Sequence, residues 1–103
     1  MNPAAAPDLP SYAEFEAQAH ADGFDQVLER HWEPGTVLET HTHPFDVRAI
    51  VVQGEMWLSC QGEVLHLRAG DRFALQRELP HDEHYGAEGA TYWVARRHGL
   101  APG

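Results

Sequence analysis

The chain has 103 residues, which suits one small domain, and its formal net charge is −9 with no lysine at all. The arginines are scattered and form no basic stripe, which excludes nucleic acid and anionic membrane surfaces as partners. Because Cys60 is the single cysteine, an intrachain disulfide and a thiolate zinc cluster are also excluded.

The first residues, MNPAAAPDLP, lack the charged start and the apolar stretch of a signal peptide. No apolar run approaches the ~18 residues that a membrane span needs. We therefore expect a soluble, cytoplasmic protein. The Pro- and Ala-rich composition of residues 1–10 predicts a flexible N-terminal tail.

A short helix is predicted to begin at Ser11. Ser11 and Glu14 fit the capping box, in which each residue satisfies a backbone N–H of the other. Tyr12, Phe15 and Ala19 fall on one face of such a helix. Gly23 can adopt the left-handed conformation that ends it.

Short strand-like runs follow the helix as far as residue 98, and Gly-containing turns at Gly35, Gly54, Gly62, Gly70 and 86–89 separate them. About seven or eight short strands at this spacing are typical of an all-β sandwich or barrel. The connections are too short for helical crossovers, so we expect antiparallel pairing. This predicts a single domain over 11–98 and a C-terminal tail over 99–103. The predicted strands read FDQVLERHW, TVLETHTHPF, VRAIVVQ, EMWLSC, EVLHLRA, RFALQ, HDEHY and TYWVARR.

A pair of histidines lies in one of these runs, ETHTHPF. On a strand, His41 and His43 would project from the same face with their Cα atoms about 6.5–7 Å apart. Two imidazoles at that separation can converge on one ion, at metal–nitrogen distances of about 2.0–2.1 Å. The alternative is coincidence, because a chain with eight histidines produces such a pair by chance.

Two motifs surround this pair. The first consists of Gly35, His41, His43 and Gly54, and the second of Gly70, Asp71, Pro80 and His81. Together they resemble the motifs of the small single-domain cupins, and the resemblance covers Gly35 to Tyr85. It implies an antiparallel double-stranded β-helix, or jelly-roll barrel, with one short N-terminal helix added. It also implies that His41, His43 and His81 meet at one metal ion.

The chain departs from the cupin pattern at Val47, where the family has a glutamate ligand. Asp46 is adjacent, but on a regular strand it points away from the histidines unless Pro44 makes the backbone irregular. Glu83 lies two residues after His81 and shares its face. Both carboxylates remain open as a fourth ligand, with Glu83 slightly preferred.

Three further residues are predicted to line a substrate cavity. By strand alternation Tyr85 shares the face of His81, so its hydroxyl would reach a ligand, although core packing is the alternative. Trp57 and Phe73 are expected in the core or in the cavity wall.

The expected function is a mononuclear three-histidine metal site that binds or transforms a small organic molecule. Three nitrogen ligands fit Zn, Ni, Cu, Co or Fe, and an added carboxylate favours Fe or Mn. The resemblance implies chemistry of the dioxygenase or isomerase type. The alternatives are a non-catalytic barrel that senses a metabolite or metal, and a metal-free barrel with vestigial histidines, so the sequence does not decide whether the protein is an enzyme.

We also expect a homodimer, because the outer strands of a small barrel are open edges and cupins commonly pair through such strands. In that arrangement the N-terminal helix would cap one mouth of the barrel or join the dimer interface.

Overall fold

The computed structural model describes residues 9–99, so the tails predicted at 1–10 and 99–103 lie largely outside the described residues. The predicted helix is confirmed as α1 (Tyr12–Ala21), with both bonds of the capping box between Ser11 and Glu14 in place. Gly23 follows it in the left-handed region, with φ of 93°. No helix within residues 9–99 has the length and apolar character needed to cross a membrane.

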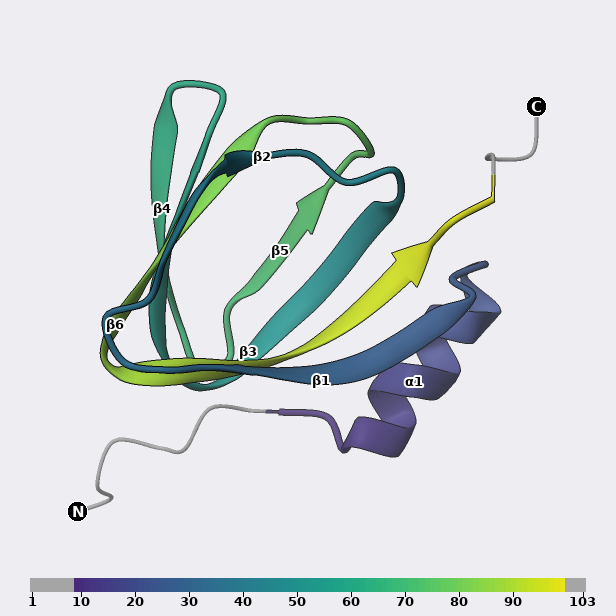
Figure 1. Cartoon of the computed structure of the whole chain (residues 1–103). Coiled ribbons are helices and arrows are strands. Elements are labelled where there is room, and N and C mark those ends of the chain that lie inside the picture. Colours follow the sequence, from purple (N-terminus) through teal and green to yellow (C-terminus); the bar gives the residue numbers. More distant parts are fainter. Residues whose placement is uncertain (1–8, 100–103) are drawn as a thin grey trace, which may run out of the picture.

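Antiparallel strands make up most of the remaining chain, as predicted (Figure 1). The long strands β3 and β6 pair with each other along their lengths and belong to both halves of the sheet. One half has the order β1-β6-β3-β5, and the other has the order β2-β6-β3-β4. The strands are β1 (Gln26–Trp32), β2 (Val37–His41), β3 (Asp46–Cys60), β4 (Glu63–Arg68), β5 (Arg72–Leu75) and β6 (His81–Arg97).

The turns predicted at Gly54 and at 86–89 are wrong, because β3 and β6 continue through both positions. The pairing register of β3 with β6 shifts there instead, so these glycines mark bulges at which the sheet bends. Gly54 has φ of 78°, and a β-carbon on it would overlap the carbonyl oxygen of Gly89. The close approach of the two strands therefore requires glycine, and the bends bring the two halves face to face (Figure 1).

Two groups of apolar side chains stabilise the fold. The larger group fills the space between the two halves and includes Val51, Met56 and Leu58, each at most 1% exposed. The smaller group lies on the outer face of the sheet, where Phe15 and Ala19 of α1 pack against its strands. The helix therefore covers the outside of the sheet and not a mouth of the barrel (Figure 1).

Candidate metal centre

Three histidines from two distant parts of the chain lie close together. His41 ends β2 and is paired in register with His81, which begins β6. The ring centroids are 4.4 Å apart for His41 and His81, 4.8 Å for His41 and His43, and 5.0 Å for His43 and His81. One candidate ligand atom from each lies within 4.8 Å of the other two. The predicted gathering of these side chains is confirmed.

The sequence predicted that His43 lies on a regular strand, but it lies in the loop after β2. Its carbonyl oxygen accepts a hydrogen bond of 2.7 Å from the backbone N–H of Glu78. Its ring stacks on Phe45 with centroids 4.9 Å apart and an interplanar angle of 12°. The loop therefore fixes the third imidazole beside the two that the sheet positions.

Backbone carbonyls orient the rings of His41 and His81. The Nδ1 atom of His41 lies 2.7 Å from the carbonyl oxygen of Glu39, and that of His81 lies 2.9 Å from the carbonyl oxygen of Leu79. Because a carbonyl oxygen only accepts hydrogen bonds, Nδ1 carries the proton in both neutral rings. Each Nε2 then presents a lone pair, which is the arrangement that metal-binding histidines adopt.

The carboxylate of Glu83 faces these two lone pairs. Its Oε2 atom lies 3.5 Å from Nε2 of His41 and 3.7 Å from Nε2 of His81. Two ligands that each bind one ion at about 2.0–2.2 Å lie about 3–4 Å apart, so both distances suit a shared ion. The side chains of Glu83 and His81 are buried, and Nε2 of His81 has no hydrogen-bond partner among the described residues.

Tyr85 holds the other oxygen of this carboxylate. Its hydroxyl donates a hydrogen bond to Oε1 of Glu83, and the residue is fully buried. Burial above all, and then its neighbours Tyr92 and Glu83, raise the pKa of Tyr85, so the phenol keeps its proton. Tyr85 therefore acts as a donor to Glu83 and is not among the residues that line the cavity beside the histidines.

His43 is held in its neutral form. Burial, followed by the neighbouring His81 and His41 rings, lowers the pKa of His43 to about 4. A neutral imidazole is the form that donates a lone pair to a metal ion. At pH 7 the ring is therefore ready to bind a cation without first losing a proton.

A small cavity of about 80 Å³ adjoins the three histidines and Glu83. Phe73 lines it, as predicted, and so does Val47, the residue that replaces the cupin glutamate. The cavity is lined by Arg30, Trp32, Leu38, His41, His43, Phe45, Val47, Phe73, Leu75, His81, Glu83, Tyr92, Val94 and Arg96.

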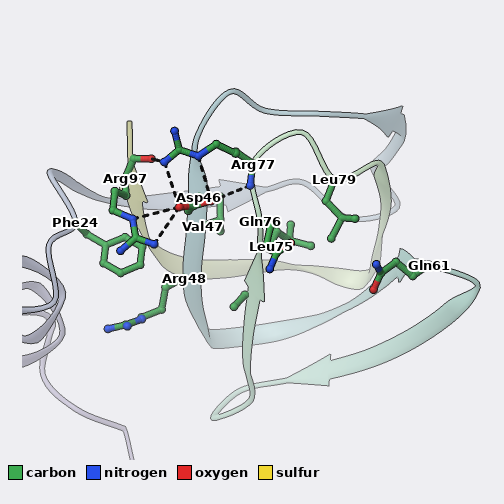
Figure 2. Close-up of a pocket in the computed structure, with 11 residues that line it drawn as sticks. Phe24, Asp46, Val47, Arg48, Gln61, Leu75, Gln76, Arg77, Leu79 and Arg97 are labelled. Carbon is green, nitrogen blue, oxygen red and sulfur yellow. Dashed lines mark hydrogen bonds and ion pairs between the residues drawn. The ribbon is translucent and has the colours of Figure 1, made fainter. Parts of the chain in front are cut away.

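Asp46, the other carboxylate considered as a ligand, lies in an ion-pair cluster (Figure 2). Its Oδ2 atom is 3.2 Å from Nη2 of Arg77 and 3.0 Å from Nη2 of Arg97. Hydrogen bonds from the Arg77 side chain, its backbone N–H and Arg97 lower the pKa of Asp46 to about 2. The cluster borders a wider hollow of about 770 Å³ that none of the three histidines lines, so Asp46 does not lie beside them.

Trp57 was wrongly predicted to line the substrate cavity. Its ring stacks on His66 with centroids 4.5 Å apart and lies 5.5 Å from the ring of His84. Both histidines are exposed, whereas the neighbouring residues of β3, Met56 and Leu58, point into the core. Strand alternation places Trp57 on the opposite face from these two, which is outside the barrel.

Two arginines in the cavity wall, Arg30 and Arg96, were missed in the sequence. Arg30 lies between Leu28 and Trp32 at alternate positions of β1, and all three contribute to the inner side of the sheet. The same alternation in β6 puts Arg96 on the face of Val94. The sequence signal that could have identified both is an arginine at a position that alternates with residues facing the inside of the barrel.

The comparisons with known proteins agree with this architecture. The fold is similar to that of an uncharacterised double-stranded β-helix protein from Klebsiella pneumoniae, with a TM-score of 0.63, 26% identity, and 78% of this chain and 72% of that chain covered. It is also similar to an RmlC-like cupin from Shewanella frigidimarina, with a TM-score of 0.62, 20% identity, and coverage of 72% and 67%.

A larger protein of known activity shares the fold. Bacillus subtilis oxalate decarboxylase, described with Mn(II) centres, matches with a TM-score of 0.64 and 22% identity. The match covers 74% of this chain but only 22% of that one, and at this identity it shows the fold alone. No curated protein matches the chain in sequence.

The family of the chain follows from its sequence as well. Residues 23–102 match the family described as the AraC-like ligand binding domain. This match spans all six strands and the three clustered histidines. The chain therefore belongs to the AraC-like ligand binding domain family and has the cupin fold that the sequence predicted.

Proposed function

We propose that the protein binds one divalent transition-metal ion through His41, His43 and His81, with Glu83 as a fourth ligand, and holds a small organic molecule beside it. The metal would contribute Lewis acidity and open coordination positions for oxygen atoms of that molecule. The contribution of the chain is to fix the imidazoles, exclude water and set the charge around the ligand.

One observation carries this proposal: Nε2 of His81 is buried without a hydrogen-bond partner among the described residues, and a carboxylate oxygen of Glu83 lies beside it. Nε2 of His41 and Nε2 of His81 present lone pairs, and the acceptor opposite both is a carboxylate oxygen of Glu83. With both rings neutral these three acceptors repel one another, and a buried polar atom without a partner, such as Nε2 of His81, is costly. A cation among them turns the repulsion into coordination.

Glu83 would supply the negative charge that a glutamate at position 47 supplies in the cupin pattern. A glutamate at position 47 would come from β3, whereas Glu83 comes from β6, two residues after a histidine ligand. The resulting set of three nitrogens and one carboxylate oxygen favours Fe(II) or Mn(II), while Zn, Ni, Co and Cu also accept such ligands. Oxalate decarboxylase, a structural neighbour with Mn(II) centres, supports testing manganese first.

Metal analysis of the purified protein tests the proposal. After exposure to Fe, Mn, Ni, Co, Cu and Zn salts and removal of free ions, we expect about one equivalent of metal per chain. His81→Ala should abolish stoichiometric binding, because it removes a buried ligand. His66→Ala is the matched control, because His66 pairs with Glu55 on the outside of the barrel and should leave metal content unchanged.

Less than about a tenth of an equivalent with every salt would refute the metal proposal and favour a barrel with vestigial histidines. Equal metal loss in His66→Ala and His81→Ala would also refute it, since binding would then be non-specific.

A second candidate function is non-catalytic sensing of the same small molecule. The match to a ligand binding domain family favours it, and so does the small cavity, in which Glu83 is the single carboxylate. Oxygen uptake by the metal-loaded protein with catechols, thiols and keto acids distinguishes the two. Turnover would support an enzyme of the dioxygenase type, whereas tight binding without turnover would support a sensor.

A homodimer remains a prediction that fits this picture. The two halves of the sheet leave β1, β2, β4 and β5 as outer strands, and Val64 and Leu65 of β4 are exposed. Exposed apolar edge strands are surfaces that proteins cover by pairing. Sedimentation equilibrium of the wild type and of Leu65→Lys tests this, and a monomeric wild type would contradict it.

A further inference from the structure

The charge of the cavity wall indicates the kind of molecule that the cavity accepts. Arg30 of β1 and Arg96 of β6 both line the cavity that adjoins the three histidines. The chain as a whole carries 16 acidic residues and a net charge of −9. Two arginines that line a cavity inside so acidic a protein need a physical explanation.

Neither guanidinium has a carboxylate partner. Among residues 9–99, no Asp or Glu oxygen lies within ion-pair distance of Arg30 or Arg96, and Nε of Arg96 is buried without a hydrogen-bond partner. Most of the other arginines do contact carboxylates, namely Arg48, Arg68, Arg77 and Arg97. The remaining arginine, Arg72, also has no carboxylate partner among residues 9–99, but it is exposed to solvent, whereas Arg30 and Arg96 line a cavity.

Aromatic rings position these two guanidiniums. The Cζ atom of Arg96 lies 4.8 Å from the ring centroid of Phe45, and that of Arg30 lies 4.7 Å from the ring centroid of Trp32. A ring face stabilises the cation but accepts none of its in-plane hydrogen bonds. Burial above all, and then the charge of Arg30, lower the pKa of Arg96.

Arg96 also lies where the departure from the cupin pattern occurs. It is the register partner of Val47 in the pairing of β3 with β6. The chain therefore has an apolar side chain where the resemblance places a carboxylate, and a cation directly across from it. With a divalent ion bound, Glu83 alone could not balance the positive charge of the ion and both arginines.

We propose that the ligand of this cavity is a small carboxylate anion whose carboxylate is held by Arg96 and Arg30 while an adjacent oxygen reaches the metal. The proposal rests on the metal site proposed above. Arginine suits this role because its planar N–H groups match a carboxylate in two parallel hydrogen bonds. The cavity beside the histidines is small, about 80 Å³, so anions of a few carbon atoms are the first candidates.

Calorimetric titration of the metal-loaded protein with lactate, pyruvate and lactamide tests this proposal. Lactamide has nearly the shape of lactate without its charge. We expect lactate and pyruvate to bind, and lactamide to bind at least about tenfold more weakly, because it cannot make charge-assisted hydrogen bonds with the arginines.

Arginine variants identify the side chains responsible. Arg96→Gln and Arg30→Gln should each weaken lactate binding about tenfold or more, with little effect on lactamide. Arg72→Gln is the matched control, because Arg72 is exposed, makes no ion pair with residues 9–99 and does not line the cavity. It should bind lactate as the wild type does. Thermal melts verify that all three variants are folded.

The outcomes separate this inference from the metal proposal. If metal binds but lactate and pyruvate do not, or if they bind equally well to Arg96→Gln and Arg30→Gln, the anion proposal is wrong and the metal site stands. If metal does not bind, the metal proposal is wrong, and the same titration of metal-free protein decides the inference. Arginine-dependent binding then supports the anion pocket, and absent binding refutes it.

Discussion

Glu83 and Asp46 lie near opposite ends of the paired strands β3 and β6, and their surroundings are opposite in character. Asp46 receives hydrogen bonds from the guanidiniums of Arg77 and Arg97 and from a backbone N–H, so its charge is balanced within the chain. Glu83 has one donor, the hydroxyl of Tyr85, and otherwise faces nitrogen lone pairs. The charge of the first carboxylate is therefore balanced within the chain, whereas that of the second is balanced by a bound cation in the function proposed above.

The positions of both carboxylates depend on the bends of β3 and β6, and we expect Gly54→Ala to have the largest effect on the stability of the fold. The substitution combines an unfavourable positive φ with overlap on the Gly89 carbonyl oxygen. We expect a loss of about 3 kcal/mol or more in the free energy of unfolding, measured by urea denaturation.

Gly62→Ala is the control for this effect. Gly62 has a similar φ of 81°, but a β-carbon there would meet nothing within 4 Å. It should lose only about 1–2 kcal/mol, which is the conformational part alone. Equal losses in the two variants would contradict the close approach of the strands.

Glu83→Gln tests the metal side of the comparison. Removing a ligand charge should weaken metal binding about a hundredfold, measured by competition with a chelator, since even outer residues of metal sites contribute about 10–100-fold. Stability of the metal-free protein should not fall, because a carboxylate that repels its neighbours is removed. Asp46→Asn should leave metal affinity within about twofold of wild type. If Asp46→Asn weakened metal binding as much as Glu83→Gln does, the two carboxylates would be equivalent and the assignment of Glu83 would be wrong.

Asp46→Asn tests the structural side. We expect a loss of about 1–2 kcal/mol in stability at pH 7, because Arg77 and Arg97 lose their partner. The contacts lower the pKa of Asp46 from 3.8 to about 2, so the stabilisation is present above pH 4 and disappears as the pH falls toward 2. The difference between wild type and variant in urea titrations should shrink over that interval, and a difference independent of pH would argue against an ionic origin.

Tyr85→Phe should produce the smallest effect. It removes the donor that orients Glu83 without changing a proposed ligand, so metal affinity should fall about tenfold. Tyr12→Phe is a suitable control, because the Tyr12 ring packs against Trp93 on the outside of the sheet. Unchanged metal affinity in Tyr85→Phe would show that packing alone fixes the carboxylate.

Strand alternation predicted more of the site than of the strand boundaries. It placed Glu83 and Tyr85 on the face of His81, and the side-chain contacts agree. Strand alternation could not distinguish a turn from a bulge at Gly54, because a glycine between strand-like runs is typical of both. The helix was predicted well because its capping residues are local, whereas its place on the outer face depends on contacts far along the chain.

Residue type misled the interpretation where alternation would have corrected it. Trp57 was expected in the core or in the cavity wall, yet it alternates with the buried Met56 and Leu58. Arginines are usually exposed, so residue type alone does not point to Arg96 as part of a cavity wall. Its role depends on the absence of a carboxylate partner among residues 9–99, and spatial partners cannot be read from one sequence.

The bulge at 86–89 sets the phase of β6. Before it the odd-numbered positions His81, Glu83 and Tyr85 are buried, and after it the even-numbered Val94 and Arg96 line the cavity. Deleting one residue within the bulge would rotate one segment by half a repeat against the other. Either His81 and Glu83 or Arg96 would then turn to solvent, so chain length at this point governs whether these side chains line one cavity.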